Sequence, residues 1–216
     1  MKNFVVFTHG VYRTAHLDFY RKLCRSSIKI AVNGGLRFFL KAHIVPDLLI
    51  GDLDSLKNVR KASLRHTKVM TFPKRKDKTD LQLALEYSLN ERADRIDIVL
   101  PSFGQPDHFL GNMMLVNIVG GQRRAGLLPK IRFVNIKYEI LFVSDRSESF
   151  VDQIGDMVSV VPLSDFVVLT CTGTTYDVRK AKIERGQTRG LRNRVTSSKA
   201  AFDIKGQALL IHHLTP

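Results

Sequence analysis

The stretch PDLLIGDLDS, residues 46–55, decides the fold class of this chain. Its apolar centre, Leu48-Leu49-Ile50, has the length and composition of a short buried strand. Gly51 ends this strand, and the carboxylates of Asp52 and Asp54 follow it at once. In an open parallel sheet, ligands bind beyond the carboxyl ends of the strands. The stretch therefore predicts one strand of such a sheet, with two acidic residues at its ligand-binding end.

Similar apolar, β-rich runs extend this pattern over the first two thirds of the chain. The runs are Phe4–Phe7, Ile28–Val32, Leu48–Ile50, Val69–Phe72 and Ile96–Leu100. Helical patterns lie between them, most clearly at Asp80–Leu89, and His108–Val119 repeats the pattern. Strands that alternate with helices predict right-handed βαβ units. We therefore expect residues 1–143 to form a doubly wound, mainly parallel sheet with helices on both faces.

The last third of the chain has a different pattern, with short strand-like segments and no convincing helix. The segments are Ile131–Asn135, Tyr138–Val143, Met157–Pro162, Phe166–Thr170, Asp177–Ile183, Ala200–Ile204 and Ala208–His212. Polar or glycine-bearing turns, such as Lys205-Gly206, separate them. Short strands with regular turns predict an antiparallel sandwich or barrel. We expect this all-β domain to span residues 144–216, with the boundary near Ser144.

Length and composition exclude several classes of protein. The chain has 216 residues, of which 44% are hydrophobic and 25% are charged. This is an ordinary globular balance, which excludes a disordered, collagen-like or coiled-coil chain. The apolar runs are too short to span a bilayer or to serve as a secretory signal. Cys24 and Cys171 show no metal-ligand spacing, so we expect reduced thiols in a cytoplasmic protein.

The charge balance is strongly basic, with 34 Lys and Arg against 20 Asp and Glu, a net charge of +14. The excess gathers in two stretches, Lys57–Lys78 and Arg179–Lys199. Such a surface attracts nucleotides, nucleic acids or acidic membranes. The simpler interpretation is a solvated basic face, and composition alone favours it.

Asp52 and Asp54 form the first candidate site. They are two residues apart in a loop, so both can approach one hard cation. Mg²⁺ takes oxygen ligands and leaves room for substrate phosphates. The alternative is structural: Asp52 ends a turn, and Asp54 or Ser55 caps the next helix.

Asp80 is a second acidic point, at the start of the helical pattern Asp80–Leu89. Taken alone, it is explained as a residue that complements the helix dipole. The loop Lys74-Arg75-Lys76-Asp77-Lys78 leads into it, however, and a cationic loop before a helix N-terminus favours phosphate. The loop and Asp80 together fit a magnesium–polyphosphate complex better than phosphate alone.

Two weaker signals follow other predicted strands. Asp107 comes after Pro106, and it is also explained as an ordinary first-turn acid of a helix. Gly34-Gly35 permits close approach of the backbone to a ligand. The histidines, among them His9, are scattered along the chain, and we interpret most of them as surface or packing residues.

Together these signals place carboxylates, a glycine pair and a basic loop at the ends of four strands. Carboxylates for Mg²⁺ and cations for phosphates are the components of phosphoryl-type transfer. The chain has no Gly-x-x-x-x-Gly-Lys-Ser/Thr loop and no protein-kinase motif set, which excludes both of those classes. It also has no Gly-x-Ser-x-Gly motif, which argues against a serine hydrolase.

The order of several motifs resembles the thiamine pyrophosphokinase family. The motifs are Asn33-Gly34-Gly35, Pro46-Asp47, Gly51-Asp52-Leu53-Asp54-Ser55, Lys78-Thr79-Asp80 and Asp107-His108-x-x-x-Asn112. Ile154–Leu163 is similar to the start of the second, all-β domain of that family. Gly173-x-x-Tyr176 and Gly190-Leu191-Arg192-Asn193 are similar to its later landmarks. The resemblance spans nearly the whole chain.

This resemblance implies an enzyme that transfers a pyrophosphoryl group from ATP to the hydroxyl of thiamine and releases AMP. ATP would be the co-substrate and Mg²⁺ the cofactor. It also implies a homodimer with active sites between subunits. In each site, a nucleotide-binding catalytic domain, residues 1–143, would meet the acceptor-binding domain, residues 144–216, of the partner.

The basic loop and the resemblance together give a full set of expected site residues. Metal binding and catalysis fall to Asp52, Asp54 and Asp80. Nucleotide binding is expected of Gly34, Gly35, Ser55, Lys74, Lys76, Lys78, Gln82, Asp107, His108 and Asn112. Substrate binding is expected of Asp47, Tyr176, Arg192 and Asn193.

Three stretches depart from the family pattern. Asn33 stands where the family has Asp, and Phe103-Gly104-Gln105 where it has Gly-Gly-Arg. Arg192-Asn193-Arg194 stands where it has Ser-Asn-Glu.

Two alternatives remain open: the same reaction on another heteroaromatic alcohol, such as a pterin, and a nucleic-acid-binding protein. The basic stretches contain a single aromatic residue, Phe72, so they offer few stacking platforms and make nucleic acid an unlikely partner.

Overall fold

A computed structural model describes residues 1–52, 64–102, 104–120 and 128–214 of the chain. The chain divides into two compact units, residues 1–136 and residues 137–216, and each is described by itself. The division falls before the boundary that the sequence suggests near Ser144. The reason is that Tyr138–Val143 is the first part of a longer strand, β7 (Tyr138–Val151), which pairs along its length inside the second unit.

The first unit alternates strands and helices, as its sequence pattern predicts. In chain order the elements are β1 (Asn3–Phe7), η1 (Thr14–His16), α1 (Leu17–Cys24), β2 (Ile28–Val32), η2 (Asn33–Gly35), α2 (Leu36–Ala42), β3 (Leu48–Gly51), β4 (Lys68–Thr71), α3 (Asp80–Asn90), β5 (Arg95–Val99), α4 (Pro106–Met114), α5 (Val116–Gly120) and β6 (Lys130–Val134). The pattern at His108–Val119 predicts one helix, but the structure has two, because the helix ends at Met114 and α5 begins after Leu115.

The strands of the first unit form a sheet in the order β6-β5-β1-β2-β3-β4, and neighbouring strands are parallel. The chain builds the sheet outward from β1 to β4 and then returns to place β5 on the other side of β1. The direction of building thus reverses between β1 and β5. In an open parallel sheet, such a switch point, at the carboxyl ends of the strands, is where ligands bind.

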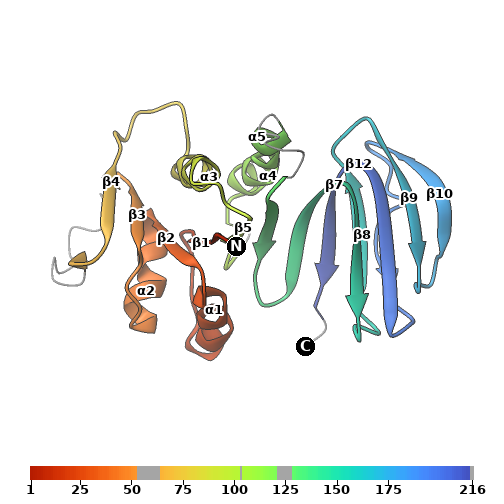
Figure 1. Cartoon of the computed structure of the whole chain (residues 1–216), viewed down its shortest axis with the longest axis horizontal. Coiled ribbons are helices and arrows are strands. Elements are labelled where there is room, and N and C mark those ends of the chain that lie inside the picture. Colours follow the sequence, from red (N-terminus) through yellow and green to blue (C-terminus); the bar gives the residue numbers. More distant parts are fainter. Residues whose placement is uncertain (53–63, 103, 121–127, 215–216) are drawn as a thin grey trace. The chain divides into compact units, whose positions relative to one another are not determined.

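Helices cover both faces of this sheet (Figure 1). On one face, Phe7 of β1 stacks on Phe38 of α2, with 4.0 Å between the ring centroids. On the other, Phe4 of β1 meets Tyr87 of α3 edge to face at 6.5 Å. Alternate residues of a strand point to opposite faces, so one apolar strand supplies both cores. This explains why β1 reads as a continuous apolar run.

The second unit is built from antiparallel strands. They are β7 (Tyr138–Val151), β8 (Met157–Pro162), β9 (Phe166–Thr172), β10 (Val178–Glu184), β11 (Asn193–Arg194) and β12 (Lys199–His213). The long strand β12 is the centre of the unit. It pairs with β7 along its length, with β9 through Ala201–Lys205 and with β8 through Ala208–His213.

The prediction of two strands with a turn at Lys205-Gly206 is wrong. Ala200–Ile204 and Ala208–His212 belong to one strand, β12, which carries a bulge between Ile204 and Gln207. Gly206 has φ +99° and donates its N–H to the carboxylate of Asp145 at 2.8 Å. A bulge and a turn both need a glycine of positive φ, so their sequence signals coincide. The bulge marks the place where β12 changes its partner from β9 to β8.

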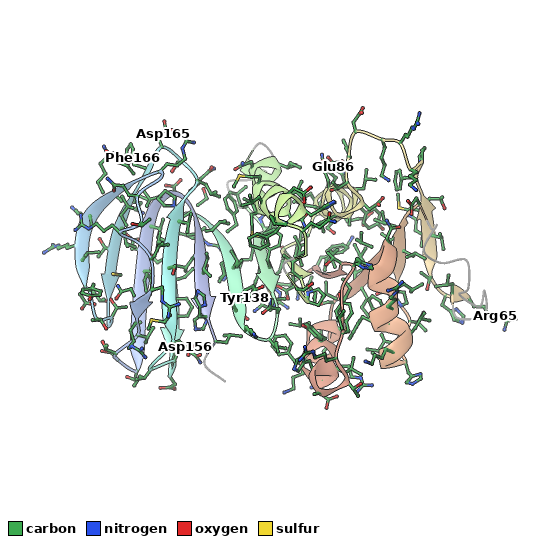
Figure 2. All side chains as sticks on the ribbon, turned by 180° about the vertical axis from the view of Figure 1, so that it is seen from behind. Arg65, Glu86, Tyr138, Asp156, Asp165 and Phe166 are labelled. Atoms are coloured by element: carbon green, nitrogen blue, oxygen red, sulfur yellow. The ribbon has the colours of Figure 1, made fainter. Side chains whose placement is uncertain are left out.

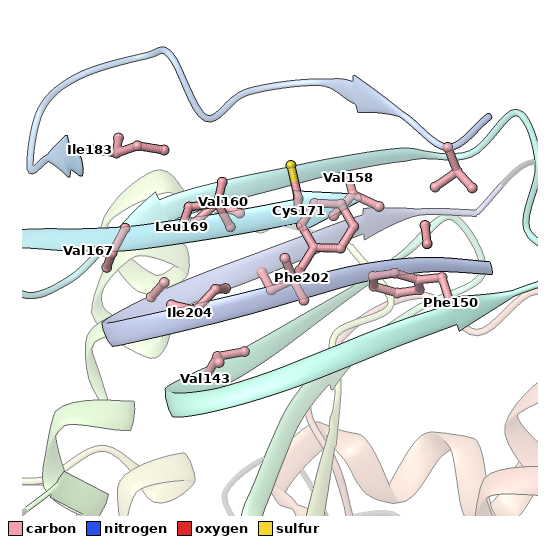
Figure 3. Packing of buried hydrophobic residues seen from close by; sticks show 14 residues of the cluster. Val143, Phe150, Val158, Val160, Val167, Leu169, Cys171, Ile183, Phe202 and Ile204 are labelled. Atoms are coloured by element: carbon pink, nitrogen blue, oxygen red, sulfur yellow. The ribbon is translucent and has the colours of Figure 1, made fainter. Parts of the chain in front are cut away.

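The strands of the second unit enclose one apolar core (Figure 3). Phe202 of β12, Val160 of β8 and Leu169 of β9 contribute to it, together with the buried thiol of Cys171. In Figure 2, Asp156 and Asp165 lie at opposite ends of these strands.

In the part of the chain that the structure describes, no helix is long and apolar enough to cross a membrane.

Candidate active site

A cavity of about 760 Å³ lies at the carboxyl ends of the parallel strands in the first unit. We call it the edge cavity. Its lining comes from the segments that follow β1, β2, β3, β4 and β5, and from the first turns of α3 and α4. The residues used below are Thr8, His9, Asn33, Asp52, Lys74, Lys76, Lys78, Asp80, Gln105, His108 and Asn112. The parallel sheet explains this gathering, because it brings the ends of all its strands to one edge.

The carboxylate of Asp80, in the edge cavity, contacts side chains from two other segments of the chain. It occupies the first turn of α3, which Thr79 caps by accepting the N–H of Gln82 at 3.2 Å. One carboxylate oxygen, Oδ2, accepts the amide Nδ2 of Asn33 at 2.5 Å. The other, Oδ1, lies 2.9 Å from Nζ of Lys76. Segments after β2, after β4 and at the start of α3 therefore converge on this one carboxylate.

Residues that line this cavity carry oxygen atoms suited to a hard cation. Among the residues that the structure describes, Asn33 Oδ1 and Asp80 Oδ1 are buried without a hydrogen-bond donor. Lys76 contacts Asp80 Oδ1 as an ion pair, but at angles outside those of a hydrogen bond. Asp52 lines the same cavity. Carboxylate and amide oxygens are the ligands that Mg²⁺ accepts, so the residues fit this ion.

The third expected metal ligand cannot be placed. Asp54 and Ser55 lie outside the described residues, and no group of three His, Cys, Asp or Glu side chains suited to a metal occurs within the described ranges. Of the expected ligands, the structure thus brings together Asp52 and Asp80.

The basic loop that precedes α3 borders the edge cavity with three of its four cations. Lys74, Lys76 and Lys78 line the cavity, whereas Arg75 is exposed and does not. The ammonium of Lys78 also donates to the carboxylate of Glu86 in α3 at 2.8 Å, and this hydrogen bond lowers the pKa of the Glu86 carboxyl. The loop therefore presents positive charge beside the acidic residues, as a site for a metal-bound polyphosphate requires.

Gln82 does not line the edge cavity. Its side-chain amide donates to Glu86 at 3.0 Å, along the surface of α3. His108 and Asn112 of α4 do line the cavity, but Asp107 does not. The carboxylate of Asp107 accepts the N–H of His108 at 2.8 Å, which is the structural role of a first-turn acid.

The protein itself fills the space beside Gly34 and Gly35, so the absence of side chains there is explained without a ligand. A side chain at Gly34 would collide with the imidazole of His9, and one at Gly35 with the carbonyl of Phe7. Neither glycine lines the edge cavity. The glycines are needed for the close packing of η2 against the end of β1.

Asp47 lies apart from the other acidic residues. It precedes β3, whereas Asp52 follows it, so the two stand at opposite ends of the strand. The carboxylate of Asp47 accepts the backbone N–H of Lys29 at 2.7 Å and pairs with its ammonium at 2.7 Å. The expected role of Asp47 in substrate binding is therefore not supported; it joins the amino ends of β2 and β3.

Thr8 and His9 are cavity residues that our sequence interpretation missed. They follow β1, which lies at the centre of the sheet beside the switch point. The available signal was their position after the first apolar run. The rule that ligands bind beyond strand ends applies to this histidine as it does to the carboxylates.

The second unit has a cavity of its own, of about 530 Å³, which we call the β-unit cavity. Tyr176 and Asn193 line it, and the side chain of Arg192 does not. Asn193 is fully engaged with the preceding loop: its Oδ1 accepts the N–H of Tyr176 at 3.0 Å, and its Nδ2 donates to Thr174 Oγ1 and to the Tyr176 carbonyl, both at 2.9 Å. Tyr176 itself is 70% exposed.

The two arginines that replace the serine and glutamate of the family have different surroundings. Arg194, in β11, donates to the carbonyl of Gly155 at 3.0 Å and so ties this strand to the loop before β8. Arg192 is exposed, and its backbone N–H donates to Ser159 Oγ at 2.9 Å. Neither side chain enters the β-unit cavity.

Comparisons with known proteins agree on one family. The family model described as "Thiamin pyrophosphokinase, catalytic domain" matches residues 19–124. The thiamine pyrophosphokinase of Bacillus subtilis (strain 168) is 29% identical over 187 residues, which cover 84% of this chain and 85% of that protein. A crystal structure of thiamine pyrophosphokinase from Bacillus subtilis superposes with a TM-score of 0.83 at 26% identity and covers both chains completely.

A second solved structure shows the same fold. Thiamin pyrophosphokinase from Geobacillus thermodenitrificans has a TM-score of 0.80 at 24% identity, covering 100% of this chain and 98% of that one. The sequence motifs and these comparisons agree: the chain is similar to the thiamine pyrophosphokinase family in sequence over 84% of its length and in fold over its whole length.

Proposed function

We propose that this protein is a thiamine diphosphokinase, which transfers a pyrophosphoryl group from ATP to the hydroxyl of thiamine. The observation that carries the proposal is the edge cavity, in which Asp52 and Asp80 lie beside Lys74, Lys76 and Lys78. Acidic ligands for a cation and lysines for phosphates meet there in a chain similar to the thiamine pyrophosphokinase family. The reaction needs both.

The hydroxyl oxygen of thiamine forms a bond to the β-phosphorus of ATP. The bond between that phosphorus and the oxygen bridging to the α-phosphate breaks, and AMP leaves. No covalent enzyme intermediate is needed, so catalysis consists of positioning and charge neutralisation. Bound Mg²⁺ would supply electrostatic stabilisation of the phosphate oxygens.

Residues of this chain perform the remaining tasks. Lys74, Lys76 and Lys78 bind the phosphates through charge-assisted hydrogen bonds. Asp52, Asp54 and Asp80 hold the metal, and Asn33 keeps the carboxylate of Asp80 in place through its 2.5 Å hydrogen bond. His108 and Asn112 of α4 line the cavity, where they contact the nucleotide.

We assign nucleotide binding to the first unit and acceptor binding to the second. Tyr176 supports the second assignment: its ring is exposed at the mouth of the β-unit cavity, where it can stack on a heteroaromatic acceptor.

We also propose a homodimer, in which each subunit offers Tyr176 to the edge cavity of its partner. Light scattering at assay concentration checks this, and full activity at the monomer mass would contradict it.

The test of the proposed reaction is product analysis. The full-length protein is incubated with ATP, MgCl₂ and thiamine, and the products are separated by chromatography. We expect AMP and thiamine diphosphate in equal amounts, and neither without thiamine. Formation of ADP and thiamine monophosphate would contradict pyrophosphoryl transfer, and no thiamine-dependent product would contradict thiamine as the acceptor.

The cytoplasmic location remains a prediction from the sequence. Both cysteines are free, Cys171 buried and Cys24 partly buried. Burial raises the pKa of the Cys24 thiol to about 12, so this thiol stays protonated and unreactive at neutral pH. Two free thiols suit a reducing compartment.

A further inference from the structure

The ion pair between Lys76 and Asp80 is unusual for a surface loop, because both side chains are largely enclosed. They are 16% and 15% exposed, and Nζ lies 2.9 Å from Oδ1. The ammonium also donates to the carbonyl of Pro73 at 3.1 Å. The neighbouring Lys78 forms a more exposed pair with Glu86 instead. Of these two loop lysines, it is Lys76 that is held against an acidic residue of the edge cavity.

The oxygen that Lys76 contacts is also suited to a metal. Asp80 Oδ1 and Asn33 Oδ1 are the buried oxygens of this site that receive no hydrogen bond from a described residue. Asp80 Oδ2 is already engaged by Asn33. A cation bound by Asp80 would therefore compete with the ammonium of Lys76 for Oδ1, because two positive charges cannot share that oxygen without strong repulsion.

Lys76 has a second set of partners available in the same cavity. It belongs to the basic loop that lines the cavity with Lys74 and Lys78. A triphosphate would offer several anionic oxygens to the ammonium of Lys76. The ammonium could therefore move away from Asp80 without becoming an unpaired buried charge. The carboxylate would in turn be neutralised by the metal that accompanies the nucleotide. Lys76 would then be paired with phosphate and Asp80 with the metal. A buried ion pair can separate at little cost only if each charge finds such a partner.

We propose that Lys76 is an exchange residue: without nucleotide its ammonium occupies the cation position at Asp80, and it moves to the phosphates when metal-bound ATP enters. This inference rests on the proposed function for the identity of the ligand. Its consequence is that the free metal binds weakly, while the metal–nucleotide complex binds well. The site is thereby protected from divalent cations that arrive without a substrate.

The experiment measures binding rather than turnover. Mn²⁺ replaces Mg²⁺ because its free concentration is read directly by electron paramagnetic resonance. The full-length protein and its Lys76→Met variant are titrated first with Mn²⁺ alone. They are then titrated with the complex of Mn²⁺ and α,β-methylene ATP, which cannot react because its α,β bridge is carbon. Lys78→Met is the matched control, since it removes the same charge from the same loop but from a pair with Glu86.

Exchange predicts changes of opposite sign in Lys76→Met. Its affinity for Mn²⁺ alone should rise about tenfold over that of Lys78→Met, because Asp80 is left with an unpaired carboxylate. Its affinity for the Mn²⁺–nucleotide complex should fall, because one phosphate contact is lost. An unchanged Mn²⁺ affinity relative to Lys78→Met, or two changes in the same direction, would overturn the exchange.

The same titrations separate this inference from the proposed function. If the unmodified protein fails to bind the Mn²⁺–nucleotide complex, the proposed function fails, whatever the variants do. Circular dichroism verifies that Lys76→Met is folded. If it is not, Lys76→Gln replaces it, because the amide retains a hydrogen-bond donor for Asp80 and for the carbonyl of Pro73. The expected and contradicting outcomes are then the same.

Discussion

The imidazole of His9 lies against the Cα of Gly34, so closely that any side chain at Gly34 would collide with Nδ1 of His9. The contact joins the ends of two neighbouring parallel strands, β1 and β2. His9 lines the edge cavity and Gly34 does not. The glycine therefore serves the site indirectly, by giving the histidine its place.

The Gly34→Ala variant tests this relationship. We expect it to lose about 1–3 kcal/mol of stability, the usual range for overpacking, and to bind ATP less tightly because His9 is displaced. Urea denaturation and the KM for ATP measure the two effects. Gly111→Ala is the control, since nothing lies within 4 Å of its new methyl group. In the middle of α4 it should gain up to about 1 kcal/mol. Equal effects of both variants would refute the packing argument.

Asp80 and Asp47 should behave differently, although the family resemblance assigns both to the site. Asp80→Asn should lower turnover at least about 100-fold, because a ligand to a catalytic cation is worth several kcal/mol. Asp47→Asn should keep its turnover, since Asp47 pairs with Lys29 at the other end of β3. Its stability should fall by less than about 1 kcal/mol, as for other half-exposed ion pairs. Steady-state kinetics distinguishes the two, and a large loss of turnover in Asp47→Asn would restore its role in the site.

Asn193 should act on the acceptor through Tyr176. Its side chain hydrogen-bonds the N–H and the carbonyl of Tyr176 and the hydroxyl of Thr174, all in the loop that carries this tyrosine. Asn193→Ala should therefore raise the KM for thiamine and leave the KM for ATP nearly unchanged. Tyr176→Ala should have the same effect, and Tyr176→Phe, which retains the ring, should have little. A larger increase in the KM for ATP than in the KM for thiamine would argue against an acceptor role for this loop.

The pair of His212 and Asp156 should be important for stability rather than activity. Nε2 of His212 lies 2.6 Å from Oδ2 of Asp156, and both side chains are 5% exposed. Leaving a buried polar group without its hydrogen-bond partner costs about 1–3 kcal/mol, and more when the group is charged. His212→Gln should therefore lower the urea midpoint strongly. His213→Gln is the control: His213 is less buried, and burial together with the nearby charge of Arg192 lowers its pKa. Equal losses in both variants would contradict a special role of the pair.

The lowered pKa of His213 also has a consequence for pH. Because the folded protein binds this proton less readily than the unfolded chain, the unfolded chain is protonated first as the pH falls through 6.5, the ordinary histidine value. Stability from this group is therefore present above that pH and lost below it. His213→Gln should flatten the acid side of the stability curve.

The first unit could be predicted from sequence because its signals are local. Each strand is a short apolar run, and ligands gather at the carboxyl edge of any such sheet. That reasoning places Asp52, Asp80 and the basic loop at one edge of the sheet, and in the structure they line the edge cavity together. Asp47 was expected in the site from the family resemblance alone, and the structure places it at the opposite end of β3 from Asp52.

Other features depend on contacts between distant segments. The space beside Gly34 is filled by His9, which a sequence pattern cannot show. The bulge at Gly206 has the same glycine signal as a turn, and its effect is decided by the pairing of β12 with β7. In both cases the sequence indicates that a glycine is required. The residue that makes the glycine necessary belongs to a distant part of the chain.

The basic loop provides the last prediction, because two adjacent cations in it have different surroundings. Lys74 lines the edge cavity, whereas Arg75 is exposed and lies outside it. A charge-assisted contact to phosphate is worth roughly 1.5–3 kcal/mol, so Lys74→Ala should raise the KM for ATP about tenfold or more. Arg75→Ala removes the same charge one residue away and should change the KM for ATP far less. Kinetics at low ionic strength, where such contacts are strongest, measure both. Equal increases would mean that the loop acts through its general positive field, because only direct contact with phosphate depends on which side chain faces the cavity.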